Sequence, residues 1–326
     1  AGTVTHTGGS ATNTGALVGY NSIGDSLILT GSIALSNPDW QLVGTSSVPT
    51  FINYTDRPSG LYSLAELGDT ATFVNPAALN WNFTNSGDGY VSATTEGIWI
   101  MADLPHLQME IGFMETTANN YEIDNVIELQ LMAVDLDGDY VLSQDFSASA
   151  TETWGVNDEG FNPVGFNPGG PSIGNRFSGT LNGNYHTIDG LTISRSTTKN
   201  VGLFGVGQGG AGVMVSNLNL TSVNIKGKRY VGALFGSTRG NPADINNVFV
   251  EGAVTATLGF VGGLVGDNEF VIRNSLADVF VSSTGVNAGG LVGKTIDDIF
   301  NSAAIGKVVS SSSNVGGLVG GAGEVT

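Results

Sequence analysis

The sequence predicts an all-β protein, a parallel β-helix in which the chain winds through stacked turns of similar length. Three observations indicate this fold: a recurring leucine flanked by glycines, a recurring asparagine in segments whose apolar and polar residues alternate, and 49 glycines among 326 residues. Soluble proteins contain about 7% glycine, so the number found is roughly twice the usual one. Such a content, spaced regularly, is typical of a repeat protein.

The first element is a short unit of glycines and apolar residues. It recurs as GALVG at 15–19, VGLFG at 201–205, GALFG at 232–236 and GGLVG at 262–266, 289–293 and 316–320. The leucines of the later units follow one another at spacings of 31, 30, 27 and 27: Leu203, Leu234, Leu264, Leu291 and Leu318. We expect one leucine per turn, stacked inside, with the glycines permitting positive φ or a close approach between turns.

The second element lies between these units and alternates like a β-strand. It carries one asparagine per turn, at spacings of 30, 27 and 27: Asn217, Asn247, Asn274 and Asn301. These spacings match those of the leucines, so the asparagines should also lie above one another. We expect an asparagine ladder at a corner, in which each amide satisfies turn backbone groups of its own and adjacent turns.

The units VGLFG and GGLVG resemble the GLUG motif of filamentous-haemagglutinin-like bacterial adhesins and of the β-helical part of IgA-peptidase-like surface proteins. The runs DLDGDYVLSQDF, FNPVGF and FSGTLNGNYHTIDGLTIS, which begin at residues 135, 161 and 177, look like the entry into such a module. The resemblance covers residues 120–326. It implies a β-helix of GLUG-type turns in a secreted protein of the bacterial cell surface. It implies no catalytic residues, because chemistry in the peptidase-like members belongs to a separate domain.

We expect three segments along the chain. Residues 1–50 are the end of one β-helical module, in which the repeat is lost at NPDWQLVGTSSVPTFIN, residues 37–53. Residues 51–118 form a small irregular connector with an end cap, and residues 119–326 form a capping helix and a second β-helical module. A solenoid needs such caps because an uncovered terminal turn exposes apolar side chains and unpaired backbone groups.

Each cap has its own signals. In the connector, Ser63 and Glu66 have the capping-box spacing that opens a short helix. The connector also carries aromatic residues that we expect to cover the open end of the stack: Trp81, Phe83 and Trp99. In the run YEIDNVIELQLMAV at 121–134, Asn125 and Glu128 have a second capping-box spacing. Three residues of this run fall on one helical face: Ile127, Leu131 and Val134.

Joining the end of the sequence to its beginning places Leu17 after Leu318 at a spacing close to that of the last two leucine steps. Our hypothesis is that these residues are about one period of a tandem array. Its partners would then be neighbouring copies of the same repeat, placed end to end.

The composition excludes several classes of protein. Lys and Arg number 11 against 29 Asp and Glu, giving a formal net charge of −18, which disfavours binding to nucleic acid or to anionic lipid. No stretch approaches the ~20 apolar residues that span a bilayer, so we expect no membrane insertion. There is no cysteine, and three histidines, His6, His106 and His186, have no metal-ligand spacing.

The only candidate metal ligands are Asp135, Asp137 and Asp139 of DLDGD, a spacing that begins like a calcium loop. The twelfth position of that loop is Phe146 instead of a bidentate acid, so the loop is incomplete. A solvated turn after the capping helix is the alternative interpretation. The run AGGLVGKT at 288–295 lacks the first glycine of a phosphate-binding loop, and we interpret it as a turn unit. No other cofactor is indicated.

We therefore predict a structural or adhesive rod segment, without catalytic activity, of a large secreted cell-surface protein or extracellular filament. Its partners would include host or cell-surface glycans or proteins, bound at the loops GQGGAG at 207–212 and STRGNPAD at 237–244. Two alternatives stay open. One is a carbohydrate-active β-helix enzyme, although the basic residues Lys226, Lys228 and Arg229 have no adjacent acid group in the sequence. The other is a passive stalk for a catalytic domain elsewhere in the polypeptide.

Overall fold

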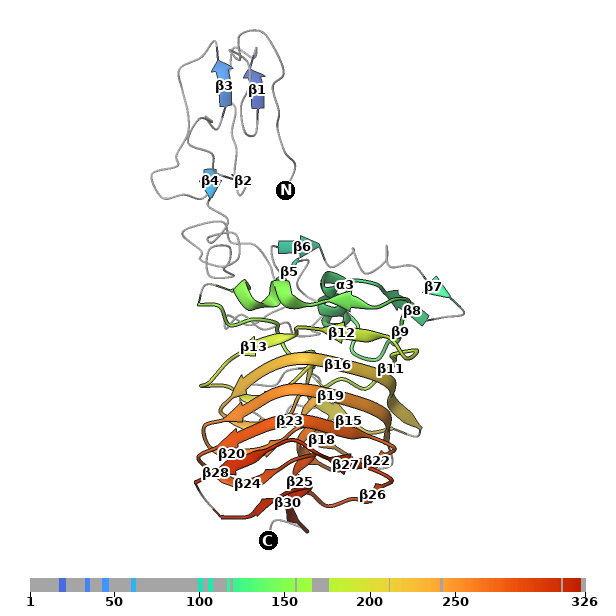
Figure 1. Ribbon diagram of the computed structural model, residues 1–326. Helices are drawn as coiled ribbons and strands as arrows, with labels where there is room; N and C mark the ends of the chain where they lie inside the picture. The colour runs from blue at the N-terminus through green and yellow to red at the C-terminus, as the bar shows by residue number, and fades with distance from the viewer. Residues whose placement is uncertain are drawn as a thin grey trace.

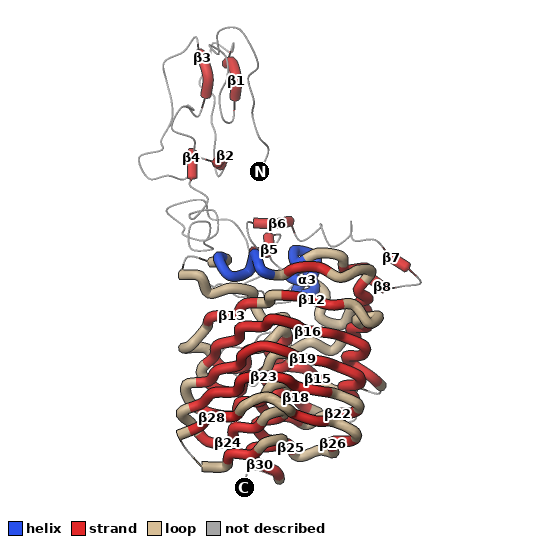
Figure 2. Tube along the Cα trace, in the orientation of Figure 1, coloured by secondary structure: helices blue, strands red, loops and turns tan. Residues whose placement is uncertain are grey.

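In the computed structural model, most of the chain after residue 120 forms a β-solenoid, in which successive coils of β-strands stack on one another (Figures 1 and 2). We call each coil a turn. The described residues are 120–323 without 156, 166–175, 211, 241–242 and 312, together with seven short strands between residues 18 and 117. Equivalent strands of successive turns pair in parallel. The prediction of an all-β parallel β-helix is confirmed.

Two faces of the solenoid are five-stranded sheets. One consists of β14 (Lys199–Val201), β17 (Arg229–Val231), β20 (Gly259–Gly262), β24 (Val286–Gly289) and β29 (Val315–Gly316). The other consists of β15 (Phe204–Gln208), β18 (Phe235–Arg239), β21 (Val265–Asn268), β25 (Val292–Thr295) and β30 (Val319–Ala322).

A 14-stranded sheet supplies the remaining side and contains the longest strands, β16 (Val213–Gly227) and β19 (Asp244–Ala256). Its other strands in the solenoid are β11 (Thr180–Asn182), β12 (Thr187–Asp189), β13 (Thr192–Ser194), β22 (Val271–Arg273), β23 (Leu276–Ser283), β26 (Ile299–Phe300), β27 (Ala303–Ala304) and β28 (Val308–Ser310). At the capped end it includes β7 (Thr116–Thr117), β8 (Asn120–Ile123), β9 (Asp139–Leu142) and β10 (Phe146–Ser147).

The register of these sheets gives the length of each turn. Val201 pairs with Val231, Val231 with Val261, Val261 with Ala288 and Ala288 with Val315. Two longer turns are therefore followed by two shorter ones, in the order that the leucine and asparagine spacings have. Backbone pairing thus follows the period that the sequence repeats define.

The recurring leucines lie at the bend between the two five-stranded sheets. Four are fully buried: Leu203, Leu234, Leu264 and Leu291. The amide of Leu234 donates to the carbonyl of Leu264 at 3.0 Å, Leu264 donates to Leu291 at 2.8 Å, and Leu291 donates to Leu318 at 2.9 Å. Leu318, in the last described turn, is 37% exposed because no further described turn covers it.

An aromatic column, which the sequence analysis did not identify, fills the interior of the early turns. The rings of Phe177 and Phe204 are 4.3 Å apart, those of Phe204 and Phe235 4.8 Å, and those of Phe235 and Phe270 6.1 Å. Tyr140 extends this column, with its ring 6.4 Å from that of Phe177. At Phe204 and Phe235, ring packing takes the place of the valine that the GGLVG turns have at the same register position.

The first described turn is capped by a helix, α3 (Val126–Leu131), followed by the 3₁₀ turn η2 (Met132–Val134). The predicted N-cap is confirmed, since the Asn125 side chain accepts from the amides of Ile127 and Glu128. Glu128 bonds back to the amide of Asp124 at 2.9 Å, one residue before the position that a capping box uses. A second 3₁₀ turn, η3 (Ser149–Thr153), precedes the described loop at 157–165.

The buried face of the cap helix differs from the predicted one. The fully or mostly buried residues are Val126, Leu129, Gln130 and Leu131, whereas Ile127 and Val134 are only half-buried. The helix is short and then tightens into a 3₁₀ turn, so the 3.6-residue period used in the prediction does not continue to Val134. The buried Gln130 amide exchanges two hydrogen bonds with the backbone of Asn162, at 2.9 and 3.0 Å.

The short strands near the N-terminus also pair in parallel at about the repeat distance. β1 (Val18–Asn21) pairs with β3 (Val43–Ser46), and β2 (Ile33–Leu35) pairs with β4 (Gly60–Tyr62). The described strand β3 lies within residues 37–53, where the sequence predicts loss of the repeat, so one parallel strand at about the repeat distance is found there. The missed signal is LVG at 42–44, because Leu42 follows Leu17 at the same spacing as the paired valines, Val18 and Val43.

The rest of the connector contributes one antiparallel pair among the described strands, β5 (Trp99–Met101) with β6 (Pro105–Leu107). The predicted helix at Ser63–Glu66 and the expected packing of Trp81 and Phe83 lie outside the described residues. The boundaries at residues 50 and 118 stay predictions.

The leucine column gives a matched pair of substitutions. Leu264→Ala removes a fully buried side chain between two neighbouring turns and should lower the free energy of unfolding by about 3 kcal/mol. Leu318→Ala, in the open last turn, should cost less than about 1.5 kcal/mol. Urea denaturation of both variants measures the difference, and equal losses would contradict the placement of Leu264 in a closed interior.

Candidate functional site

The asparagines of the predicted ladder stand at a corner with left-handed backbone. Their φ angles lie between 48° and 58°: Asn217, Asn247, Asn274 and Asn301. Asparagine is tolerant of this region, which explains the choice of residue at each turn. All four are half-buried or exposed, so the ladder lies at the protein surface.

The amides of this corner bond to one another from turn to turn. Asn217 Nδ2 donates to Asn182 Oδ1 at 3.1 Å, and Asn247 Nδ2 donates to Asn217 Oδ1 at 2.9 Å. Further along the stack, Asn301 Nδ2 donates to Asn274 Oδ1 at 3.4 Å. Each of these bonds joins two adjacent turns through side chains alone.

The ladder has one irregular step. Asn274 Nδ2 donates to Asn246 Oδ1 at 2.8 Å, so the bond bypasses the neighbouring Asn247. Sequence spacing found neither Asn246 nor Asn182, the acceptor at the first step. Asn182 lies opposite Ser216 in the register, one residue before Asn217, so a comparison of equivalent positions does not point to it.

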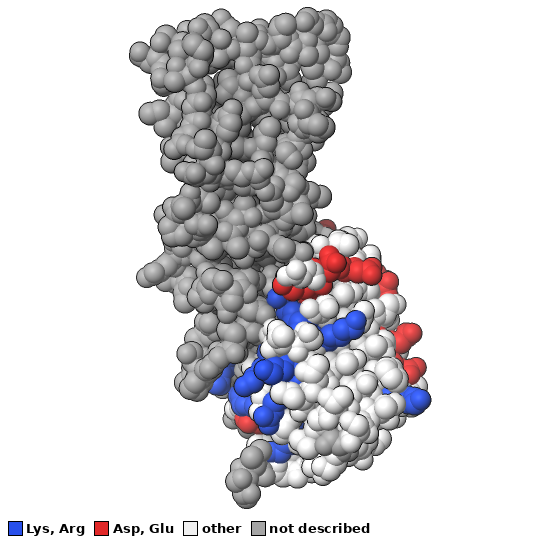
Figure 3. Space-filling model, turned by 90° about the vertical axis from the view of Figure 1, so that its left-hand side faces the viewer, with Lys and Arg blue, Asp and Glu red and all other residues white. Residues whose placement is uncertain are grey.

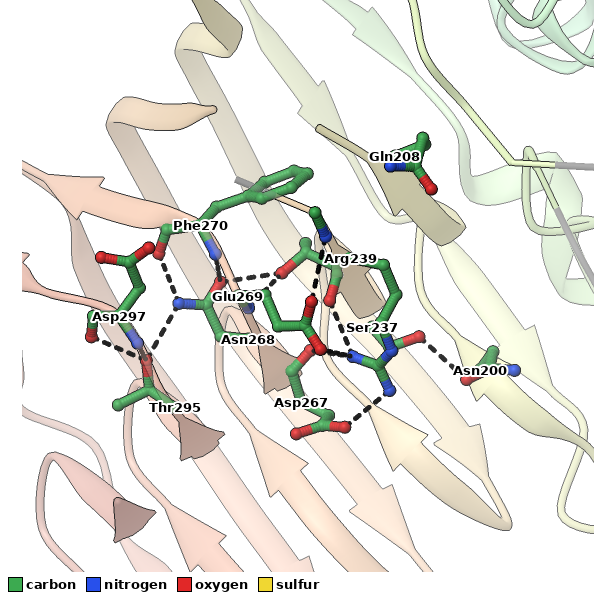
Figure 4. A network of polar contacts seen from close by, with 12 residues as sticks. Asn200, Gln208, Ser237, Arg239, Asp267, Asn268, Glu269, Phe270, Thr295 and Asp297 are labelled. Atoms are coloured by element: carbon green, nitrogen blue, oxygen red, sulfur yellow. Dashed lines mark hydrogen bonds and ion pairs between the residues drawn. The ribbon is translucent and has the colours of Figure 1, made fainter. Parts of the chain in front are cut away.

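One of the two loops predicted as binding regions, that at 237–244, meets a polar network at the ends of β18 and β21 (Figure 4). Arg239 forms ion pairs with Asp267 at 2.7 Å and with Glu269 at 3.6 Å. Glu269 also accepts from the amide of Gly240 at 2.9 Å. The arginine of the 237–244 loop is thus neutralised within the protein, which leaves it little capacity to attract a charged partner.

Below this network a buried asparagine joins three turns. Asn268 is 1% exposed and accepts from the Thr238 hydroxyl at 3.0 Å, while its Nδ2 donates to the Phe270 carbonyl and to the Thr295 hydroxyl. Both polar atoms of this buried amide form hydrogen bonds, and a buried polar atom left without a partner would destabilise the fold. We therefore interpret Asn268 as a structural residue that links adjacent turns. Thr295 itself belongs to AGGLVGKT, whose last four residues form β25 rather than the helix of a phosphate-binding loop.

The acidic run after the cap helix does not gather its three carboxylates. Asp139 Oδ1 accepts from the Thr180 hydroxyl at 2.6 Å, whereas Asp135 and Asp137 interact with each other. Burial, and then the adjacent Asp137, raises the pKa of Asp135 above its ordinary value. Within the described ranges, no group of three or more His, Asp or Glu side chains is placed to hold a metal ion.

One histidine has a defined partner. His186 Nδ1 lies 3.0 Å from Asp145 Oδ1, which also accepts from the amide of Thr187 at 2.8 Å. The backbone bond from Thr187, and then the contact with His186, lower the pKa of the Asp145 carboxyl. This pair fixes the turn before β12. His6 lies outside the described residues.

Many polar side chains of the described solenoid therefore form hydrogen bonds or ion pairs with residues of adjacent turns. No helix in the described part of the chain has the length and apolar character that a membrane crossing requires. What the geometry supports is repeated turn-to-turn cohesion.

The asparagine corner predicts an unusual order of stability. Asn247→Gly removes one amide bond but suits the φ of 58°, whereas Asn247→Ala also forces a Cβ into this conformation. The alanine variant should be about 1 kcal/mol less stable than the glycine variant in urea denaturation. At Asn246, whose φ is not positive, the order should reverse because glycine weakens a strand. The same order at both positions would contradict the role assigned to the left-handed corner.

The acidic turn yields a pH and calcium test. A carboxyl whose folded pKa is raised destabilises the folded state when it is ionised, so Asp135→Asn should increase stability at neutral pH. The gain should shrink as the pH falls through the folded pKa of Asp135, because the wild-type carboxyl is then protonated. Thermal unfolding across this pH range, with and without EDTA, measures it. A calcium-dependent rise in Tm for the wild type but not for the variant would instead establish a calcium site.

Comparisons with known proteins give a sequence relative and a structural neighbour. The chain is 34% identical over 155 residues to halomucin of Haloquadratum walsbyi, an alignment that covers 47% of this chain and spans only 2% of halomucin. A candidate immunoglobulin A1 protease from Bacteroides ovatus, solved by crystallography, is similar with a TM-score of 0.31 and 17% identity, covering 64% of this chain and 85% of that chain. No family model matches the chain.

Proposed function

We propose that this chain is a structural and adhesive segment of a secreted or cell-surface protein, and that its solenoid acts as a stiff rod. The observation that carries the proposal is the uninterrupted parallel pairing of equivalent residues through the two five-stranded sheets. In such an array each turn contacts only its neighbours, so length can be added without a change of architecture. The excess of 29 acids over 11 bases would keep separate rods apart in solution.

The likeness to halomucin supports a surface or structural role, although the chain spans only a small part of that protein. The resemblance of VGLFG and GGLVG to GLUG units agrees with the adhesive role. Together they favour a location on the cell surface or outside the cell.

We propose a neighbouring copy of the same repeat as an end-to-end partner, because joining two copies places Leu17 after Leu318 at a spacing close to that of the last leucine steps. In the last described turn, Val315 is 48% exposed and Leu318 37%, whereas their equivalents one turn earlier, Ala288 and Leu291, are fully buried. The outer edges of β29 and β30 pair with no described strand. Exposed apolar side chains beside an unpaired edge favour the addition of a further turn. We propose that the turn carrying GALVG at 15–19 of a neighbouring copy supplies it.

A location test addresses the main proposal. Antibodies against the solenoid should label intact cells of the source organism, and external protease should remove the label without lysis. Labelling only after permeabilisation would contradict a surface rod.

Hydrogen exchange addresses the array. In a polypeptide in which two copies follow one another, the amides of β29 and β30 in the first copy should exchange at least about tenfold more slowly than in a single copy. The amides of β17 and β20 are the internal control, since their pairing is complete in both cases. Unchanged exchange at β29 and β30 would contradict end-to-end stacking.

A further inference from the structure

At one corner of the solenoid, two turns carry an aromatic residue where the other turns have asparagine. At or beside the strands of the β14–β17–β20–β24–β29 sheet, one residue per turn has a φ between 54° and 62°. The register aligns these residues in a column: Asn200, Tyr230, Phe260, Asn287 and Asn314. Three are asparagine, which accepts the left-handed region, whereas Tyr230 and Phe260 are bulky exceptions.

The fold imposes this conformation whatever the side chain. Gly266 packs directly on the Tyr230 corner: a Cβ at this glycine would lie 2.6 Å from the carbonyl carbon of Tyr230 and closer still to the amide nitrogen of Val231. The same position beside the Phe260 corner is Gly293. Packing of the backbone therefore determines the positive φ at these positions. The aromatic side chains of Tyr230 and Phe260 are not needed to form the corner, and they add strain to it. Strain of this kind is characteristic of functional sites.

The aromatic side chains hold an arginine. The guanidinium carbon of Arg229 lies 4.8 Å from the centre of the Tyr230 ring and 4.5 Å from that of Phe260, and the two rings are 5.2 Å apart. Arg229 Nε is buried without a hydrogen-bond partner among the described residues. Ring faces, not a described acid, therefore fix this cation, and its charge is not neutralised there.

Three lysines extend the positive charge around this arginine. Lys199 pairs in register with Arg229 one turn earlier, and Lys226 and Lys228 precede it in the chain. None of these four cations forms an ion pair with any described residue. Figure 3 shows Lys and Arg side chains gathered on one part of the described surface, with acids at its margins. We call Lys199, Lys226, Lys228, Arg229, Tyr230 and Phe260 the cationic corner.

Two other arginines show how the protein neutralises such charges elsewhere. Arg239 is paired with Asp267 and Glu269. Arg273 also stacks on an aromatic ring, with its guanidinium carbon 4.6 Å from the centre of Phe300, but its Nε contacts an Asp244 carboxylate oxygen at 2.9 Å. A basic cluster that forms no ion pair within the described part of the chain, in a protein with a formal net charge of −18, is therefore suited to an external anion.

We propose that the cationic corner binds an acidic polysaccharide, whose carboxylate or sulfate groups contact Arg229 and the lysines while a sugar ring packs on Tyr230. Leu258, whose amide donates to the Lys228 carbonyl at 2.7 Å, is 51% exposed. Exposed apolar surface beside the site suits the face of a sugar better than a fully charged ligand. The inference rests on the proposed adhesive role and names its ligand.

Charge density favours a glycan over nucleic acid. Duplex DNA carries one charge per ~1.7 Å, and such a polyanion would meet the repulsion of the whole protein along its length. An acidic polysaccharide spreads its charges over whole sugar units, so a short stretch can engage the four cations locally. An acidic peptide offers similar charges but no rigid ring to pack on tyrosine.

The experiment measures binding of the whole chain to immobilised polygalacturonate and dextran sulfate by surface plasmon resonance, at low and at high salt. The wild type should bind at least one of them, more weakly as salt rises. Arg229→Gln should bind about tenfold more weakly, the size expected for losing one charge-assisted contact. The double variant Tyr230→Asn with Phe260→Asn should lose a similar factor while unfolding at the same or higher Tm, since it restores the residue type of the other turns.

Controls make the result specific. Arg273→Gln removes a stacked arginine that is already paired with an acid, and its affinity should stay within about twofold of wild type. Binding to polygalacturonate alone identifies carboxylated sugars, and binding to dextran sulfate alone identifies sulfated ones. Neutral dextran should not bind.

Three outcomes would overturn the inference: no binding to either acidic glycan, unchanged affinity in the corner variants, or equal binding to poly-L-glutamate or duplex DNA. These outcomes leave the surface rod intact, because antibody labelling of intact cells decides that role independently. Absence of the chain from the surface would, conversely, refute the rod whatever the glycan measurement gives.

Discussion

Hydrogen bonding between the same position in successive turns is the interaction on which this structure depends. One line of pairing runs through Val201, Val231, Val261, Ala288 and Val315. Once the backbone is paired in this way, every side chain lies above its equivalent at the ~4.8 Å spacing of adjacent strands. The leucine and asparagine columns and the stacking of Phe204 on Phe235 are consequences of that register, and each adds cohesion only between neighbouring turns.

Much of this arrangement could be predicted, because a period in the chain becomes a period in space. The spacing of Leu234, Leu264 and Leu291 indicated the stack, and the Asn125 signal indicated the cap. The acceptor Asn246 could not be predicted, since spacing points to its neighbour and only the path of the side chains distinguishes adjacent amides. The strand Val43–Ser46 was not predicted, because its unit QLVG has no glycine in the two positions before Leu42.

The candidate binding site illustrates a different limit. Lys226, Lys228 and Arg229 are visible as a small basic cluster in the sequence, but nothing there shows whether acids neutralise them. The structure brings Lys199 beside Arg229 from the preceding turn and places Phe260 against the same guanidinium. The loops chosen from sequence, by contrast, contain an arginine that two carboxylates of the next turn already satisfy. Those loops were chosen because their turns are longer than the others. The more informative departure from the repeat is the presence of Tyr230 and Phe260 at a corner where the other turns have asparagine.

A short helix, held by the hydrogen bonds of Gln130, closes the end of the described solenoid at which the first turns form. This placement of the cap has a consequence for biosynthesis. Ribosomes deliver the capped end first, so a finished template can exist while later turns are still being made. Each emerging segment then meets a ready edge and needs only local chain closure to join it. Folding in one direction would limit mispairing between strands of non-adjacent turns, which is the main folding risk for a chain built of similar repeats.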